Sequence, residues 1–274
     1  MKFSIVTPTL NSSNYVEECL RSIHEEQGGE VEVEQIVVDG GSSDGTLKIV
    51  EDFAKRTGSD ISVMHDEGST IPEAENAGLE KVTGDVWAVM NADDMYRPKV
   101  FPELASRFSR LPGVEALYGN LERVDSEGRH VWTYYPPKVS LEYYVRKGFN
   151  VGVTHPATLL RRSVIEKVGL FNTTYRYASD YEYLARVLGL CKVERIPVTV
   201  ARYRVHPSSS SVKSSTRAMQ ESESLVIAKS LASRFGIAPG STRVADTRAL
   251  MLQVRRGNLA YLLRRSARRM GEHS

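Results

Sequence analysis

The chain has 274 residues, of which 41% are hydrophobic and 26% are charged, and its formal net charge is +2 at pH 7. This balance is typical of a folded globular protein and excludes a disordered chain, and no apolar run approaches the roughly 18 residues of a membrane-spanning helix. So small a net charge gives no indication of nucleic-acid binding. The N-terminus enters a β-rich run at once, so we expect no signal peptide, and only two cysteines, Cys19 and Cys191, favour a reducing cytoplasm.

The first half of the chain alternates strand and helix patterns. Strands are predicted at residues 3–7, 34–39, 61–64 and 86–90, with helices at residues 16–23, 46–53 and 72–82 between them. Alternation of this kind predicts an α/β fold with a Rossmann-like, mainly parallel sheet and helices on both faces. In such sheets ligands bind at the carboxyl ends of the strands.

The second half is less regular. It predicts a strand at residues 114–119, a hairpin over 122–134, a strand at 157–160, helices at 163–168 and from 179, and one or two strands over 193–204. A serine-rich loop over 206–215 precedes a helical pattern from residue 219. We therefore expect one domain over residues 1–215, in two halves (1–100 and 101–215), and a helical, basic C-terminal extension over 216–274.

Acidic residues directly follow three of the predicted strands: Asp39, Asp66 and the pair Asp93-Asp94. Parallel strands bring these carboxylates to one edge of the sheet, where their repulsion requires a cation, hydroxyl donors or N–H groups to offset it. Adjacent carboxylates suit a hard divalent cation such as Mg²⁺ or Mn²⁺, shared with substrate phosphates. Asp44, in the turn after the second strand, is equally well explained as a helix cap.

A series of motifs resembles the family 2 glycosyltransferases of the GT-A fold in order and spacing. The motifs are SIVTPTLN at residues 4–11, IVVDGGSSDGT at 36–46, NAG at 76–78, TGD at 83–85, NADD at 91–94, HPA at 155–157, GLF at 169–171 and ASDYE at 178–182. The match is dense over the first hundred residues and spans about three quarters of the chain. By this resemblance residues 1–100 form a nucleotide-binding half and residues 101–215 an acceptor-binding half.

The resemblance implies an inverting, metal-dependent enzyme that transfers one sugar, a hexosyl or N-acetylhexosaminyl residue, to an acceptor hydroxyl. The donor is a nucleotide sugar, with a UDP-sugar first, the acceptor is a saccharide or a lipid-linked sugar, and the setting is cell-surface glycan or glycolipid assembly. In the family pattern Asp39 contacts the base or ribose, Asp66 the uracil, Asp93 the ribose or phosphate, and Asp94 the Mn²⁺ or Mg²⁺ ion. The implied donor-binding set is Thr7, Pro8, Thr9, Asp39, Gly41, Asp66, Asn76, Asn91, Asp93 and Arg204.

Asp180 resembles the catalytic base of the family, and its place in the sequence supports the assignment. In a helix that starts at residue 179, Asp180 begins a stripe that continues through Leu184, Val187 and Leu188, so we expect it on the inward-facing side. Glu182 lies off this stripe; we expect it to be solvated and keep it as the second candidate. The alternative for Asp180 is a first-turn acid that complements the helix dipole.

Weaker signals follow in the second half. Arg204 and His206 lie in a segment that resembles a loop closing over the pyrophosphate, so Arg204 is a candidate phosphate partner and His206 a candidate for phosphate or metal. An ordinary basic surface loop is an equal alternative. His155 is a candidate for the acceptor cleft, although a structural role is favoured. Three aromatic residues, Trp132, Tyr134 and Tyr135, fit either sugar stacking or packing.

Two segments depart from the family pattern or stand outside it. Residues 71–78 carry Glu73 and Glu75 where many relatives have Tyr-Asp-Ala-Met-Asn-Lys-Gly, which leaves the donor sugar open. The Gln-x-x-Arg-Trp motif of processive synthases is absent, which favours single-sugar transfer. The arginine-rich residues 255–269 suit peripheral contact with the inner face of the plasma membrane, and packing on the domain or on a second copy in a homodimer is an equal alternative.

The sequence lacks the motifs that two rival enzyme functions require. A sugar-nucleotide nucleotidyltransferase normally carries an early glycine-rich segment with Arg and Lys, whereas residues 4–13 contain no Gly, Arg or Lys. A dehydrogenase requires GxGxxG after the first strand, which is missing. A catalytically silent binding module is the alternative from another class, and the joint presence of Asp39, Asp93, Asp94 and Asp180 argues against it.

Overall fold

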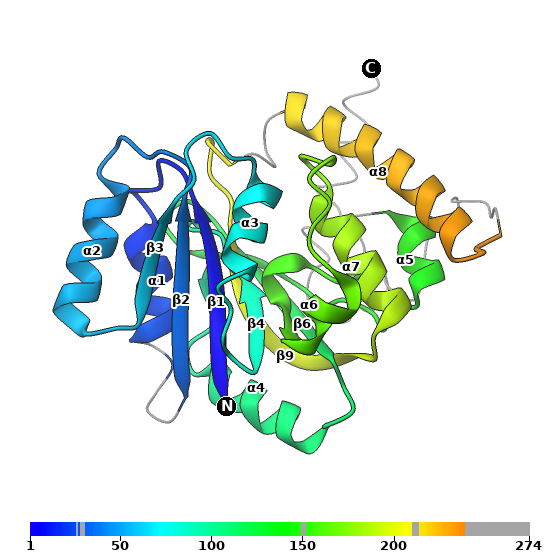
Figure 1. Cartoon of the computed structure of the whole chain (residues 1–274), viewed down its shortest axis with the longest axis horizontal. Helices are drawn as coiled ribbons and strands as arrows, with labels where there is room; N and C mark the ends of the chain where they lie inside the picture. The colour runs from blue at the N-terminus through cyan, green and yellow to red at the C-terminus, as the bar shows by residue number, and fades with distance from the viewer. Residues whose placement is uncertain (26, 28–30, 149–151, 210–213, 239–274) are drawn as a thin grey trace.

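The computed structural model describes residues 1–25, 27, 31–148, 152–209 and 214–238 (Figure 1). A single nine-stranded sheet runs through it in the order β3-β2-β1-β4-β8-β6-β9-β5, with β7 paired to β6. The strands are β1 (Lys2–Thr9), β2 (Glu32–Asp39), β3 (Ile61–His65), β4 (Val86–Val89), β5 (Met95–Tyr96), β6 (Ala116–Val124), β7 (His130–Tyr134), β8 (Thr158–Arg161) and β9 (Val193–Arg204). The four strands predicted in the first half, β1 to β4, are parallel, as expected.

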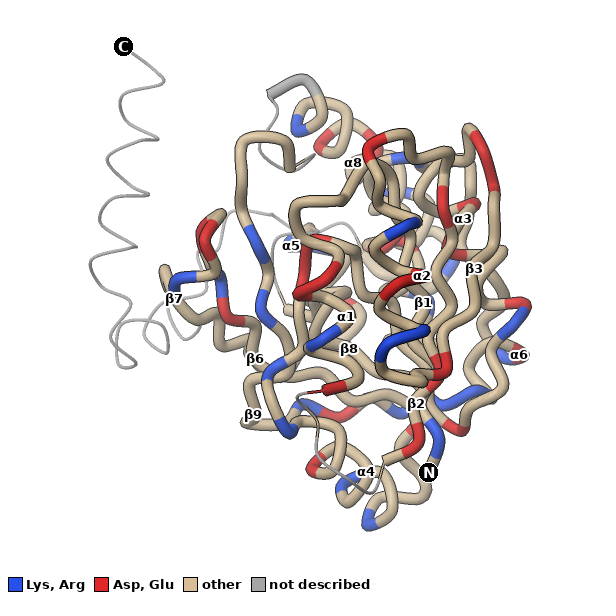
Figure 2. Tube along the Cα trace, turned by 90° about the vertical axis from the view of Figure 1, so that its left-hand side faces the viewer, with Lys and Arg blue, Asp and Glu red and all other residues tan. Residues whose placement is uncertain are grey.

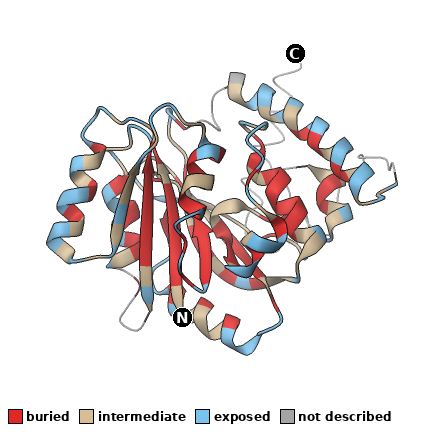
Figure 3. Cartoon of the chain, in the orientation of Figure 1, coloured by how far each residue is buried: buried red, intermediate tan, exposed pale blue. Residues whose placement is uncertain are grey.

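The central strands are buried on both faces, which explains their near-continuous apolar sequence (Figure 3). On β1, Phe3 and Ile5 point into one core and Val6 into another. The helices of the first half are α1 (Val16–His24), α2 (Thr46–Thr57), α3 (Ile71–Leu79) and α4 (Val100–Arg110). Charges of both signs alternate along the outer side of helices such as α2 (Figure 2), so each helix buries only its apolar stripe.

Helices cover both faces of the sheet, as expected. α1 and α4 pack on the face that carries Phe3 and Ile5, and α3 packs on the face that carries Val6. Gly78 lets α3 approach β1 closely, because a Cβ at this position would overlap the side chain of Val6. α4 and β5 were not expected from the sequence, although Phe101, Leu104 and Phe108 have helical spacing and are buried.

The second half adds antiparallel strands to the parallel core. β8 runs antiparallel to both β4 and β6, whereas β9 runs parallel to β6 with two register shifts. The predicted hairpin over 122–134 is formed by β6 and β7, and the predicted strands over 193–204 form one long strand, β9. Its helical elements are α5 (Leu141–Lys147), the short 3-10 helix His155–Ala157, α6 (Ser163–Val168) and α7 (Ser179–Leu190); α5 was not expected.

A C-terminal helix, α8 (Ser214–Arg234), lies across α5 and α7 (Figure 1). Ile227 and Leu231 of α8 are buried against Tyr181 and Leu184 of α7. The basic stretch 255–269 lies outside the described residues, so its proposed membrane or dimer contact stays a prediction, as does the domain boundary at residue 215. Among the described residues, no helix combines the length and apolar character needed to cross a bilayer.

Candidate active site at the strand ends

The acids predicted to meet at one edge of the sheet do lie at adjoining strand ends. Thr9 of β1 pairs in register with Asp39 of β2, and Asp39 pairs with His65 of β3, so the three strands end together. The N–H of Asp66 donates to the backbone oxygen of Asp39 at 2.8 Å. Asp93 and Asp94 follow β4, which is the parallel neighbour of β1 on its other side.

The carboxylate of Asp39 is held by the turn that follows it. Its Oδ2 accepts hydrogen bonds from the N–H of Gly41 at 3.1 Å and of Ser42 at 2.9 Å, and its Oδ1 accepts one from the Ser42 hydroxyl at 2.5 Å. Gly41 has φ of +99°, and a Cβ there would crowd Glu67, so this turn requires glycine. N–H groups therefore offset the negative charge of Asp39. Such groups were one of the three kinds of partner expected from the sequence, beside a cation and hydroxyl donors.

Asp44 stabilises the start of the next helix together with the first loop. Its Oδ1 accepts from the N–H of Thr46 at 3.1 Å and from the Thr46 hydroxyl, and its Oδ2 accepts from the N–H of Ser13 at 3.0 Å. These bonds outweigh the opposing effect of desolvation and lower the pKa of Asp44 to about 2. Asp44 thus acts near a helix start, as the capping alternative predicted, while Gly45 occupies the N-cap itself.

Asp94 is completely buried, and one of its oxygens has no partner among the described residues. Its Oδ1 accepts from the N–H of Arg204 at 2.9 Å, whereas Oδ2 has none. Burial and then the charge of Asp93 raise the pKa of the Asp94 carboxyl well above its usual range. A bound cation would supply the missing partner and remove the reason for that shift, so the residues present fit the expected metal.

Asp93, the residue before Asp94, is paired with His206. His206 Nε2 lies 3.0 Å from Asp93 Oδ2, and its ring packs on Tyr15 with a centroid distance of 4.5 Å. No group of three or more His, Cys, Asp or Glu side chains is arranged for a metal within the described ranges. A Mg²⁺ or Mn²⁺ ion bound here would have to take its remaining ligands from water or from substrate phosphates.

Arg204, the predicted phosphate partner, is one of the largest completely buried side chains of the molecule. Its Nε donates to the backbone oxygen of Asp93 at 3.1 Å, Nη1 to that of Ser126 at 2.6 Å, and Nη2 to the Glu18 carboxylate at 2.6 Å. The guanidinium also lies over the ring of Tyr15. All three of its nitrogens have protein partners, so Arg204 braces the Asp93-Asp94 loop, and its contact with phosphate stays a prediction.

Asp180 lies in the first turn of α7, as predicted, and is partly exposed. Its Oδ1 accepts from the N–H of Tyr181 at 2.8 Å. Burial raises the pKa of Asp180, and the negative charge of Glu223 raises it further. The stripe that it begins is inward-facing, since Leu184 and Val187 are buried.

The expectation for Glu182 is wrong. Glu182 is buried, not solvated, because Arg186 one turn later binds it through Nε at 2.8 Å and through Nη2 at 2.8 Å. The same guanidinium donates to the backbone oxygens of Val168 and Leu170, so the pair ties α7 to the end of α6. A carboxylate committed to a bidentate ion pair has little freedom to accept a proton from substrate, which favours Asp180 as the base.

A buried acid, Glu75, lies within electrostatic reach of Asp180 and beside a largely buried histidine, His155. Glu75 Oε1 is 3.7 Å from His155 Nδ1, and neither Glu75 Oε2 nor His155 Nε2 has a hydrogen-bond partner among the described residues. Burial, followed by the charge of Asp180, raises the pKa of Glu75 well above its usual range, and burial lowers the pKa of His155 to about 4. His155 packs on Phe171, in line with its favoured structural role.

The remaining donor-set residues take the following places. Asn76 donates to the backbone oxygen of Phe171 at 2.9 Å and accepts from its N–H at 2.8 Å, so it joins α3 to the loop before α7. Thr7 is buried and accepts from Gln35, and the Thr9 hydroxyl is buried without a partner among the described residues. Pro8 and Asn91 are partly exposed at the strand ends. Glu73, noted as a departure, forms a capping box with Thr70.

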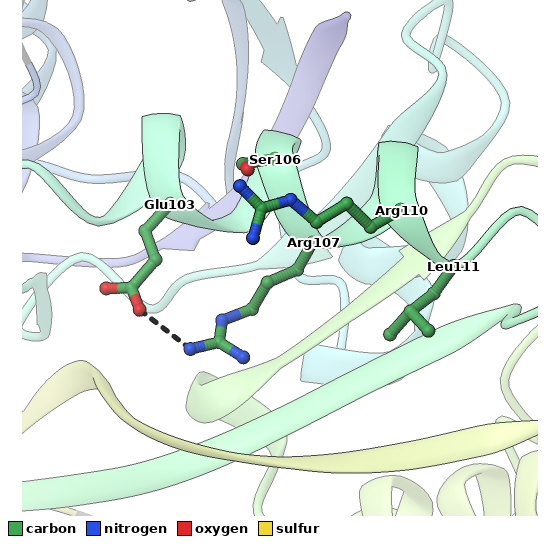
Figure 4. A pocket seen from close by; sticks show the side chains of 5 residues that line it. All are labelled: Glu103, Ser106, Arg107, Arg110 and Leu111. Atoms are coloured by element: carbon green, nitrogen blue, oxygen red, sulfur yellow. Dashed lines mark hydrogen bonds and ion pairs between the residues drawn. The ribbon is translucent and has the colours of Figure 1, made fainter.

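One surface hollow lies away from these residues. It has a volume of about 430 Å³ and is lined by Glu103, Ser106, Arg107, Arg110 and Leu111 of α4 and the residue after it (Figure 4). Glu103 forms an ion pair with Arg107 across one turn at 2.9 Å. None of the predicted site residues contributes to this hollow.

The sequence matches the family model of glycosyl transferase family 2 over residues 4–169. A PGL/p-HBAD biosynthesis glycosyltransferase of Mycobacterium tuberculosis is 28% identical over 202 residues, which is 73% of each chain.

Two solved structures share the GT-A fold with the chain. The first is residues 1–349 of Staphylococcus aureus TarS in complex with UDP, with a TM-score of 0.64 and 21% identity over 84% of this chain and 65% of that one. The chain covers 37% of a longer TarS structure. The second is the mannosyltransferase PcManGT from Pyrobaculum calidifontis with GDP-Man and Mn²⁺, with a TM-score of 0.65 and 19% identity over 97% of this chain and 79% of that one.

Proposed function

The chain belongs to glycosyl transferase family 2 and is a glycosyltransferase, and on that premise we propose that it transfers one hexosyl or N-acetylhexosaminyl residue from a UDP-sugar to an acceptor hydroxyl, with inversion and with bound Mn²⁺ or Mg²⁺. The observation that carries the proposal is the unpartnered, completely buried Oδ2 of Asp94 at the strand edge. Without a cation, the ionised carboxylate would be buried beside Asp93, with the contacts of Arg204 too weak to prevent the rise in its pKa.

The proposed roles divide between the two halves of the site. Asp94 would hold the cation, which neutralises charge on the departing diphosphate. His206, 3.0 Å from Asp93, would fix the orientation of that carboxylate toward the donor. The hydrogen bonds of the turn formed by Asp39 and Gly41 are already satisfied within the protein, so this turn would be a rigid part of the donor-binding surface.

Asp180 would act as the general base. As the acceptor oxygen attacks the anomeric carbon, its proton passes to Asp180, the bond from the anomeric carbon to the diphosphate oxygen breaks, and the electron pair leaves with the nucleoside diphosphate. A raised pKa makes Asp180 a stronger base than an exposed aspartate, and the acid limb of the pH–rate profile would report its ionisation. A single displacement of this kind inverts the anomeric centre.

The acceptor is proposed as a saccharide or a lipid-linked sugar. The support is the similarity to a relative whose name places it in PGL/p-HBAD biosynthesis. The absence of the Gln-x-x-Arg-Trp motif supports transfer of one sugar per acceptor. TarS was solved with UDP and PcManGT with GDP-Man, so both nucleotide classes belong in the test, with UDP-sugars expected to be used.

The test is release of UDP or GDP from a panel of nucleotide sugars with Mn²⁺, in the presence and absence of EDTA. We expect turnover of a UDP-sugar that EDTA abolishes, and a loss of about a hundredfold or more in Asp94→Ala and Asp180→Asn. Asp52→Asn is the matched control, because this exposed carboxylate of α2 pairs with Lys48 one turn away and belongs to no part of the candidate site. Donor binding, measured by calorimetry, should survive in Asp180→Asn.

Three outcomes would contradict parts of the proposal. Turnover that is unaffected by EDTA would remove the metal role, and turnover retained in Asp180→Asn would remove the base assignment. Binding of every donor without turnover, even with a panel of saccharide and lipid-linked acceptors, would favour a silent binding module.

A further inference from the structure

α8 places one acidic side chain over the loop that leads to Asp180. Ile227 and Leu231 fix α8 on α7, and Glu223 lies one turn before Ile227 on the same inward face. Most of the outer side of α8 is exposed, including Met219 and Val226 (Figure 3). The apolar contact of the helix therefore carries Glu223 to the loop.

The Glu223 carboxylate accepts three consecutive backbone N–H groups. Oε1 accepts from Arg176 at 3.1 Å, and Oε2 accepts from Tyr177 at 2.8 Å and from Ala178 at 2.9 Å. Ala178 is the N-cap residue of α7, and this helix has no side-chain cap of its own. An acid at this end satisfies donors that the helix leaves open and complements its dipole.

The loop before Asp180 is consequently held at both of its ends. Asn76 of α3 clamps the backbone of Phe171 at the beginning of the loop, and Glu223 of α8 clamps residues 176–178 at its end. Asp180 follows the second clamp by two residues, and its own Oδ1 is oriented by the N–H of Tyr181. The position of the Asp180 carboxylate relative to the strand edge thus depends on contacts made by α8.

We propose that Glu223 is a positioning residue of the transfer reaction, which holds the backbone in front of Asp180 and places a negative charge near the Asp180 carboxylate. The proposal rests on the proposed function, since it takes Asp180 as the base. Burial raises the pKa of Asp180, and the charge of Glu223 adds to that effect. Glu223 would therefore affect both the position and the basicity of the Asp180 carboxylate, which accepts the proton.

The experiment compares Glu223→Gln with Glu221→Gln in the full chain. Glu221 lies on the same helix, is exposed, and pairs with Arg217 one turn away, so both variants remove one charge from α8 but only one touches the loop. In Glu223→Gln we expect kcat to fall by about tenfold to a hundredfold with donor KM unchanged, as a misplaced base predicts. The acid limb of the kcat profile should move to lower pH, because a repelling charge has been removed.

A second variant separates the effect of side-chain length from the effect of charge. Glu223→Asp keeps the charge but shortens the side chain by one methylene, so kcat should fall while the acid limb stays near its wild-type position. Amide hydrogen exchange supplies a readout that needs no turnover: exchange at residues 176–178 should be faster in Glu223→Gln than in wild type or Glu221→Gln. Thermal unfolding of all three variants checks that each is folded.

The outcomes distinguish this inference from the function on which it rests. Activity retained in Asp180→Asn would overturn the base assignment and, with it, the role of Glu223 in catalysis. A second outcome is that Asp180→Asn is inactive while Glu223→Gln matches Glu221→Gln in kcat, in the acid limb and in amide exchange. This outcome would overturn the inference about Glu223 and leave the base assignment standing. A fall in kcat with an unmoved acid limb in both Glu223 variants would reduce Glu223 to a structural cap.

Discussion

The two halves of the candidate site are assembled in different ways. At the strand ends of the first half, the Asp39 carboxylate is held by N–H groups two and three residues further along the chain. In the other half of the site, around Asp180 and Arg204, the partners of the key groups are distant: Glu223 is 45 residues from Ala178, Asn76 is 95 residues from Phe171, and Arg204 is 110 residues from Asp94. Local turn chemistry builds the first half, and tertiary packing builds the second.

The comparison predicts that loss of a distant contact destabilises the protein far more than loss of a local one. The largest effect is expected for Arg204→Met, which leaves Glu18 and the Asp93-Asp94 loop without the buried cation that joins them. Removing this completely buried guanidinium, which leaves the backbone oxygens of Asp93 and Ser126 without their donor, should lower the free energy of unfolding by about 4 kcal/mol. Urea denaturation measures this change in the free energy of unfolding.

The matched control for Arg204 is Arg202→Met. Arg202 lies on the same strand, is partly exposed, and contacts Glu122 and the backbone of Gly128. Its replacement should cost about 1 kcal/mol or less, as for other exposed ion pairs. Equal losses in the two variants would break the comparison, because the burial of a distant contact would then have made no difference.

The buried pair Glu75 and His155 predicts an intermediate effect that depends on pH. The folded state lowers the pKa of His155 from 6.5 to about 4, so its contribution is complete above pH 6.5 and is lost as pH falls toward 4. The stability gap between wild type and His155→Gln should therefore shrink over that window, by up to about 3 kcal/mol. Urea titrations at pH 4 to 7 measure this gap, and a constant gap would contradict the prediction.

Glu75→Gln serves as the partner variant with the opposite sign. The pKa of Glu75 is raised in the folded state, so its contribution is present below its usual pKa of 4.5 and is lost as pH rises through the folded value. Glu75→Gln should therefore gain stability relative to wild type as pH increases. A reversal of the trend in each variant would show that the two groups form an ion pair and are not buried neutral.

The smallest effect is expected for the local contact of Asp44. Its pKa is lowered to about 2, so its contribution is present above the usual value of 3.8 and is lost as pH falls toward 2. Because Asp44 is exposed, screening by solvent should limit the loss in Asp44→Asn to under about 1 kcal/mol at pH 7. A loss as large as that of Arg204→Met, measured by the same denaturation, would reverse the comparison.

The same division explains which features could be predicted from the sequence. The strand-end rule placed Asp39, Asp66 and Asp93-Asp94 at one edge, and the structure confirms this arrangement because parallel strands leave little choice. Asp180 was placed by helical periodicity, which is also local. The metal and donor contacts of these residues stay predictions.

Other features required tertiary information. The burial of Glu182 was missed even though Arg186 stands one turn later, a spacing that indicates an ion pair but not whether it is covered. The partners of Arg204 come from α1, the loop after β4 and the β6–β7 hairpin, and no periodicity connects these segments. Glu223 stands in a helix with several other charges, and nothing in its neighbourhood distinguishes it from Glu221.

The clamp on residues 176–178 has a consequence for how such a chain can change during evolution. A C-terminal helix that only covered the domain could be exchanged between relatives as a separate module. Here the acid that caps α7 is inherited with α8, whereas the amides that it binds are inherited with the loop. A recombination point between residues 178 and 223 would separate them, so we expect the two segments to be retained or replaced as a unit.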